Sequence, residues 1–168
     1  MATRYLINIG HRQILIIESE VNRGASLKVK GYQRAFAEAG MELNSGSILY
    51  LNADVDSTSS IAYSASDLRS TAIISSSSMF TLSALKACQC LNLRIPDDIS
   101  FISYDDNEWL DFMHIDSVAH PMDEIGEMIS DFLLNMINSK ESADEHKPII
   151  KMIKPHLVVR NSVKRILL

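Results

Sequence analysis

Short apolar runs alternate with amphipathic segments along most of the chain. The runs Ile14–Ile17, Ile48–Leu51, Ala72–Ile74 and Ile99–Ile102 each have the length of one buried strand. After the first run, apolar side chains recur at helical spacing up to a stop at Gly40. Continuous apolar strands are typical of parallel sheets that are covered on both faces. The alternation therefore predicts an α/β fold, with a mostly parallel sheet and helices on both faces.

The same pattern predicts the remaining elements. A first helix should end near Ile9, because Gly10 is a typical helix stop. One of the serines Ser75–Ser78 should cap the helix that follows the third strand. Helices are expected at 25–39, 61–68, 79–91 and 123–139, a short helical turn at 109–113, and further strands at 117–119, 149–153 and 157–159.

Composition and charge narrow the classes of partner. The chain has 168 residues, which suits one domain. Its net charge of -5 at pH 7 argues against direct binding to the phosphate backbone of DNA. No apolar run reaches the roughly 18 residues of a membrane helix, and the first residues lack the apolar core of a signal peptide. Cys88 and Cys90 lie two residues apart in a predicted helix, where their side chains point in different directions and cannot bridge. We therefore expect reduced cysteines, no membrane contact and a cytoplasmic protein.

Carboxylates directly follow the fourth apolar run. A proline and two acids end the preceding helix, and the strand then stops at Tyr104-Asp105-Asp106. In open α/β sheets, ligands bind beyond the carboxyl ends of the strands. The sequence therefore predicts a ligand site around Asp105.

Five segments together resemble the lac-repressor family. They are Gly10–Ile14, Ser26–Tyr32, Leu93–Ser100, Tyr104–Asp106 and Leu157–Ser162, and they occur in the order and spacing of that family. The resemblance spans nearly the whole chain. It implies a type I periplasmic-binding-protein-like fold, in which two α/β lobes close on a small sugar or sugar-like effector and are joined to an N-terminal helix-turn-helix.

The resemblance also implies a division of the chain between the two lobes. Residues 12–120 and 156–162 would form the C-terminal lobe, whereas 1–10 and 121–155 would belong to the N-terminal lobe. The helix-turn-helix and most of the first lobe would lie outside this chain. Operator DNA would then be bound only through that helix-turn-helix, and not by this chain itself.

The resemblance assigns ligand contacts to Asp105, Lys28 and Ser77. Asp105 would accept hydrogen bonds from sugar hydroxyls, although it could instead cap the following turn. Lys28 replaces the family's usual arginine and gives a point charge rather than a planar fork, unless it is only a solvated helix lysine. Ser77 and Ser78 stand where the family commonly has Asn and Asp. Ser77 would donate to or accept from a ligand, or simply cap the helix.

Three aromatic or imidazole side chains complete the candidates. His120 falls at the crossover between lobes and would bond the ligand or serve as a structural hinge residue. Trp109 would stack on a sugar ring, or else belong to the core or rim. His11 is expected to be a structural hydrogen bonder rather than a metal ligand. The acidic cluster near Asp105 has no nearby His or Cys, so neither a metal nor a cofactor is expected.

The resemblance thus implies the effector-sensing and dimerisation domain of a bacterial transcriptional regulator, with a sugar or sugar acid as effector. A homodimer would form through the helix at 79–91, and the helix at 123–139 would self-associate if its apolar face were left uncovered. Two alternatives remain at this point: the solute-binding component of a sugar transporter, and a small α/β hydrolase using Ser77 or Asp105. No motif in the sequence favours catalysis.

Overall fold

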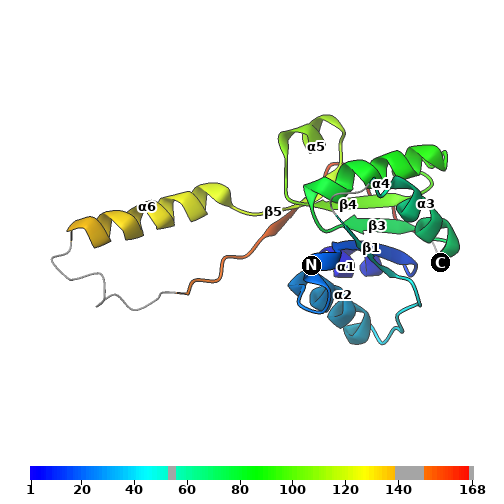
Figure 1. Cartoon of the computed structure of the whole chain (residues 1–168), viewed down its shortest axis with the longest axis horizontal. Coiled ribbons are helices and arrows are strands. Elements are labelled where there is room, and N and C mark those ends of the chain that lie inside the picture. Colours follow the sequence, from blue (N-terminus) through cyan, green and yellow to red (C-terminus); the bar gives the residue numbers. More distant parts are fainter. Residues whose placement is uncertain (53–55, 139–149, 167–168) are drawn as a thin grey trace.

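The computed structural model of the chain describes residues 1–52, 56–138 and 150–166. Strands and helices alternate as predicted, and Figure 1 shows the sheet between two helical layers. The elements are α1 (Ala2–Asn8), β1 (Ile14–Ser19), η1 (Glu20–Asn22), α2 (Leu27–Glu38), β2 (Ile48–Leu51), α3 (Thr58–Asp67), β3 (Ala72–Ser75), α4 (Ser78–Cys90), β4 (Ser100–Tyr104), α5 (Glu108–Phe112), β5 (Asp116–Ala119), α6 (Met122–Asn138) and β6 (His156–Val158).

The six strands form one sheet in the order β2-β1-β3-β4-β5-β6. Neighbours from β2 to β5 run parallel, and only the pair β5 and β6 is antiparallel. The α/β fold class predicted from the sequence is therefore confirmed. Because the first five strands point the same way, their carboxyl ends meet at one edge of the sheet.

Alternate strand residues point to opposite faces and build two apolar cores. Leu15, Ile73 and Phe101 pack with α3 and α4 on one face. Ile16 and Ile74 pack with α1 and α2 on the other. This two-sided burial explains why the strands are continuously apolar.

Helix α1 corrects the predicted division of the chain. Residues 1–10 were expected in the other lobe, but Ala2 and Leu6 are buried in the same core as α2 and β1. Arg4 also forms an ion pair with Glu38 at the end of α2. A short amphipathic helix needs an apolar partner, and α2 and β3 provide it within this lobe. Gly10 then ends α1 with φ +104°, and a Cβ there would lie 2.4 Å from the Ile166 carbonyl oxygen.

The predicted strand at 149–153 is not present in the described part of this segment. Residues 150–153 form no strand, and Ile149 lies outside the described residues. A strand needs a hydrogen-bonded neighbour, and residues 150–153 pair with none of the six strands of the sheet. Helix α6 and the segment returning from it extend away from the sheet in Figure 1, and α6 contains no buried residue. Whether 121–155 belong to a second lobe stays a prediction.

No helix within residues 1–52, 56–138 and 150–166 is long and apolar enough to cross a membrane.

Candidate functional site

The carboxyl ends of four neighbouring strands gather polar side chains at one edge of the sheet. Glu18 lies near the end of β1, Ser76 and Ser77 follow β3, Asp105 follows β4, and His120 follows β5. Since these strands are adjacent and parallel, their ends form one continuous rim. This is the edge at which the sequence predicted a ligand site.

Lys28 reaches this rim from the first turn of α2. Ser26 is the N-cap of α2, and its hydroxyl accepts a hydrogen bond from Val29 N at 3.2 Å. The Lys28 ammonium donates to the Ser76 carbonyl oxygen. It also lies 4.7 Å from the centroid of the Tyr104 ring. These contacts hold the lysine over the ends of β3 and β4 rather than in free solvent.

Asp105 forms the tip of β4 and meets His120. Its backbone is left-handed, with φ +66°, and its N–H donates to the Val118 carbonyl oxygen at 3.1 Å. The two side chains are 44% and 45% exposed, and His120 Nε2 lies 3.9 Å from the carboxylate oxygen Oδ1. The N-cap position of the following helix α5 is held by Asn107, which leaves the capping alternative for Asp105 without support. The exposed carboxylate remains available to a ligand.

The carboxylate of Asp106, the next residue, is already hydrogen-bonded to other side chains of the chain. Its carboxylate receives two hydrogen bonds from the Arg160 guanidinium, at 2.7 and 3.0 Å, and one from the Ser117 hydroxyl at 2.7 Å. The Arg160 hydrogen bonds hold the pKa of Asp106 below its usual range. The two adjacent aspartates therefore differ in role: Asp106 is structural and Asp105 faces outward.

Glu18 is the site residue that the sequence analysis missed. It is only 3% exposed, although it lies at the ligand rim. Its carboxylate accepts hydrogen bonds from Ser19 N, Asn22 Nδ2, Ser26 Oγ and Ser76 Oγ. Its position directly after the apolar run of β1 was the available signal, since the same criterion selected Asp105.

The serines after β3 form a buried hydroxyl network rather than a simple cap. Ser77 holds the N-cap position of α4, but its side chain makes no capping hydrogen bond. Its carbonyl oxygen instead accepts from Ser75 Oγ at 2.8 Å and Thr81 Oγ1 at 2.9 Å. Thr81 Oγ1 also lies 2.8 Å from Ser103 Oγ. These bonds fix the β3–α4 turn that presents Ser77 at the rim.

Trp109 lines a hollow together with residues of α4, and the rim residues Lys28, Asp105 and His120 do not line that hollow. The hollow measures about 590 Å³, and its other lining residues are Ser78, Met79, Leu82 and Asn107. Ring stacking on a ligand stays a prediction for Trp109.

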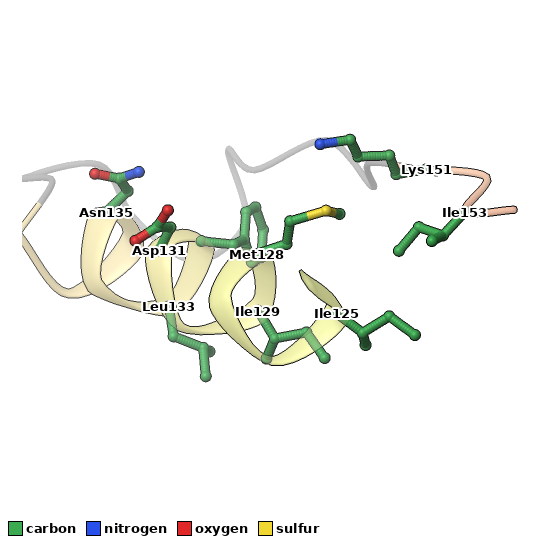
Figure 2. A pocket seen from close by; sticks show the side chains of 9 residues that line it. Ile125, Met128, Ile129, Asp131, Leu133, Asn135, Lys151 and Ile153 are labelled. Atoms are coloured by element: carbon green, nitrogen blue, oxygen red, sulfur yellow. The ribbon is translucent and has the colours of Figure 1, made fainter. Parts of the chain in front are cut away.

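A second hollow, of about 560 Å³, lies against α6 and is mainly apolar. In Figure 2 the side chain of Met128 extends toward the returning segment that carries Lys151 and Ile153, whereas Ile129 and Leu133 point away from it. This hollow lies between α6 and the returning segment, and none of its lining residues belongs to the rim at the sheet edge.

His11 contacts protein atoms at both ring nitrogens, as its predicted structural role requires. Nδ1 lies 2.9 Å from Thr71 Oγ1, and Nε2 lies 3.0 Å from the Lys164 carbonyl oxygen. The ring is 1% exposed, so it links β1, β3 and the C-terminal segment from within.

Comparison with known proteins places this geometry in a family. Residues 3–163 match the periplasmic binding protein-like domain family. The chain is 30% identical over 171 residues to the HTH-type transcriptional repressor PurR of Vibrio campbellii, covering 99% of this chain and 50% of that protein. It is 29% identical over 170 residues to the ribose operon repressor of Haemophilus influenzae, covering 97% and 49%.

A solved structure gives the same relationship. A regulatory protein of the LacI family from Chloroflexus aggregans aligns with a TM-score of 0.78 and 26% identity, covering 97% of this chain and 59% of that one. The chain spans about half the length of the curated relatives it matches. The predicted resemblance to the lac-repressor family is confirmed. The chain therefore belongs to the periplasmic binding protein-like domain family, and over nearly its whole length it is similar to LacI-family transcriptional regulators.

Proposed function

We propose that this chain is the effector-sensing domain of a bacterial transcriptional repressor, and that its effector is a small sugar or sugar-like molecule. The observation that carries the proposal is the exposed Asp105 carboxylate at the tip of β4, beside His120 and on the same rim as Lys28. In contrast to Asp106, it is not occupied by an arginine. It therefore offers charged acceptor oxygens at the place where α/β sheets bind ligands.

The rim supplies the hydrogen-bonding groups that a polyhydroxy compound needs. Asp105 accepts from hydroxyls, and Ser77 both donates and accepts. The Lys28 ammonium has three N–H donors, of which the Ser76 carbonyl oxygen takes one. The imidazole of His120 adds a further polar group from the β5 end.

Closure over the ligand would require a second lobe, as in two-lobed binding proteins. Helix α6 leaves the sheet after β5, and β6 returns beside β5, so the connection to another body would pass through this pair. Effector binding would shift the lobes between open and closed states and so move attached DNA-binding segments in the cytoplasm. Operator DNA would be bound by those segments, because this chain carries a net charge of -5.

The two alternatives are less well supported. The named relatives, matched over 97% to 99% of this chain, are repressors and not transport proteins. For a hydrolase, Ser77 would need a general base. The hydrogen bonds around Ser77 instead reach its carbonyl oxygen, from Ser75 and Thr81.

A homodimer is part of the proposal. Met79 and Leu82 on α4 are more than half exposed, and Trp109 lies beside them. An exposed apolar patch on a helix whose other face is buried in the core suits a protein interface. We assign this patch, made of Met79, Leu82 and Trp109, to contact with a second copy.

Effector binding is tested with the ¹⁵N-labelled chain and a panel of pentoses, hexoses, disaccharides and sugar acids. We expect at least one member to shift the amide signals of Lys28, Ser77 and Asp105 in a saturable way. Asp105→Asn should weaken that binding about tenfold or more, because a charge-assisted acceptor becomes a neutral amide. Asp67→Asn, an exposed change at the end of α3, should leave the affinity unchanged.

Two results would contradict the proposal. One is a folded protein to which no member of the panel binds. The other is an Asp105→Asn variant with the affinity of the unmodified chain.

A further inference from the structure

A buried carboxylate lies directly beneath the rim that we assign to the effector. Glu18 is almost completely shielded from solvent, and a carboxylate in such a place is costly unless it is hydrogen-bonded. Glu18 has four donors around it: one backbone N–H, one amide and two serine hydroxyls. These four hydrogen bonds stabilise the negative charge of Glu18 in its buried position.

The hydrogen bonds of Glu18 reach two of the residues that position Lys28, Ser26 and Ser76. Ser26, whose hydroxyl donates to Glu18, caps the helix that carries the lysine. Ser76, whose hydroxyl also donates to Glu18, provides the carbonyl oxygen that receives the lysine ammonium. Glu18 and Lys28 also line the same hollow of about 300 Å³. The Glu18 carboxylate is therefore linked to the Lys28 ammonium through Ser76, and to the helix that carries Lys28 through Ser26.

Glu18 is charged at neutral pH. Burial raises the pKa of its carboxyl. The hydrogen bonds from Ser26, Ser19, Asn22 and Ser76 together lower that pKa by more than burial raises it, so the pKa lies below the ordinary value. A buried charge acts through a medium of lower dielectric constant than water, so its field at the rim is weakly screened.

The charges along the rim then sum to a negative value. Lys28 contributes one positive charge, and Glu18 and Asp105 contribute one negative charge each, so the formal charges of these three residues sum to -1. Lys28 alone would suggest an anion site. With Glu18 beneath it, the lysine serves as a hydrogen-bond donor whose charge is already balanced.

We propose that Glu18 is a specificity-determining residue: by balancing the charge of Lys28, it makes the rim select uncharged or amine-bearing polyhydroxy ligands over anionic ones such as sugar acids and sugar phosphates. The inference rests on the proposed function and narrows its ligand class.

Inorganic phosphate is the probe, because it tests the charge of the rim without requiring the effector. The ¹⁵N-labelled chain is titrated with phosphate at constant ionic strength, and the amides of Lys28, Ser77 and Asp105 are followed. The unmodified chain should show no saturable shifts in the millimolar range. Glu18→Gln keeps the shape of the side chain and removes the charge, so it should bind phosphate about tenfold more tightly or better.

Two variants establish that the effect belongs to Glu18 and acts through Lys28. Glu20→Gln removes an equal charge two residues later, at an exposed site paired with Arg23, and should not gain phosphate binding. The double variant Glu18→Gln with Lys28→Gln should lose the binding again. A folded Glu18→Gln chain is recognised by an unchanged amide spectrum away from the rim.

Saturable phosphate binding at these amides in the unmodified chain would overturn the inference, and this measurement does not depend on any variant. It would also be overturned by Glu18→Gln failing to gain binding, or by Glu20→Gln gaining it equally. Failure of the proposed function has a different signature, because it appears as a lack of response to the uncharged sugars.

Discussion

Arg160 and Asp106 form a two-pronged salt bridge, with Nη1 2.7 Å from Oδ1 and Nη2 3.0 Å from Oδ2. The pair joins the segment after β6 to the end of β4, across 54 positions of sequence. Arg160 also donates from Nε to the Asp111 carboxylate at 2.9 Å. The bridge anchors the returning C-terminal segment beside Asp105, and so supports the backbone turn that presents the Asp105 carboxylate.

Replacing Arg160 by lysine should destabilise the fold. Lysine keeps the charge but cannot form the planar two-pronged contact, and the side chain is only 13% exposed. We expect the free energy of unfolding in urea to fall by about 1–3 kcal/mol. Arg94→Lys is the matched control, because Arg94 pairs with Asp98 at an exposed site where such pairs contribute little. Equal midpoints for the two variants would argue against a structural role for this bridge.

The strands and the polar edge of the sheet were predictable from sequence because they depend on local pattern. Apolar runs fix the buried strands, and a carboxylate directly after such a run must lie at a strand end. The roles of Asp105 and Asp106 were not predictable in the same way. The two residues are adjacent and chemically identical, and what separates them is Arg160, far along the chain.

The placement of α1 was missed for a related reason. An amphipathic helix shows that it has a partner, but not which surface provides it. The burial of Ala2 and Leu6 against α2 and β1 depends on tertiary packing, which the local sequence pattern does not specify. Likewise, 150–153 has the apolar pattern of a strand, yet a strand forms only where an open sheet edge accepts it.

The buried ring of His11 should make stability fall in mild acid. Burial lowers the pKa of His11 below 6.5, although the hydrogen bond to Lys164 opposes this shift. Between the folded-state pKa and 6.5 the unfolded chain binds the proton more readily, so the free energy of unfolding decreases as the pH falls through that window. The stabilisation is complete above 6.5, and its loss has a limiting slope of about 1.4 kcal/mol per pH unit for one proton.

Urea unfolding at pH 7.5 and pH 5.5 measures this contribution. His11→Gln removes the titrating ring, so its loss of stability between the two pH values should be smaller than in the unmodified chain. His114→Gln, at an exposed position, should leave the loss unchanged. If His11→Gln and the unmodified chain lose equal stability, the acid sensitivity comes from other groups.

Two exposed apolar surfaces among the described residues, on α4 and on α6, should differ in what they do in solution. The α4 patch of Met79, Leu82 and Trp109 lies on a helix whose opposite side, including Phe80 and Ala84, is buried in the core. The buried side of α4 holds the helix in place and so fixes the shape of the patch, as a specific interface requires. Helix α6 exposes Ile129 and Leu133 without any buried residue of its own, so its apolar face favours unspecific self-association.

A single glutamate introduced on each surface distinguishes specific dimerisation through α4 from unspecific association through α6. If the proposed dimer forms through α4, Leu82→Glu should convert it to a monomer in analytical ultracentrifugation, because a glutamate would be desolvated against its symmetry mate at the interface. Leu133→Glu should leave the dimer intact and reduce only higher-order association. Both leucines are at least half exposed, so the midpoint of chemical unfolding extrapolated to low protein concentration should stay unchanged. A dimer that survives Leu82→Glu but dissociates with Leu133→Glu would move the interface from α4 to α6, and the exposed face of α6 would then be the dimer contact.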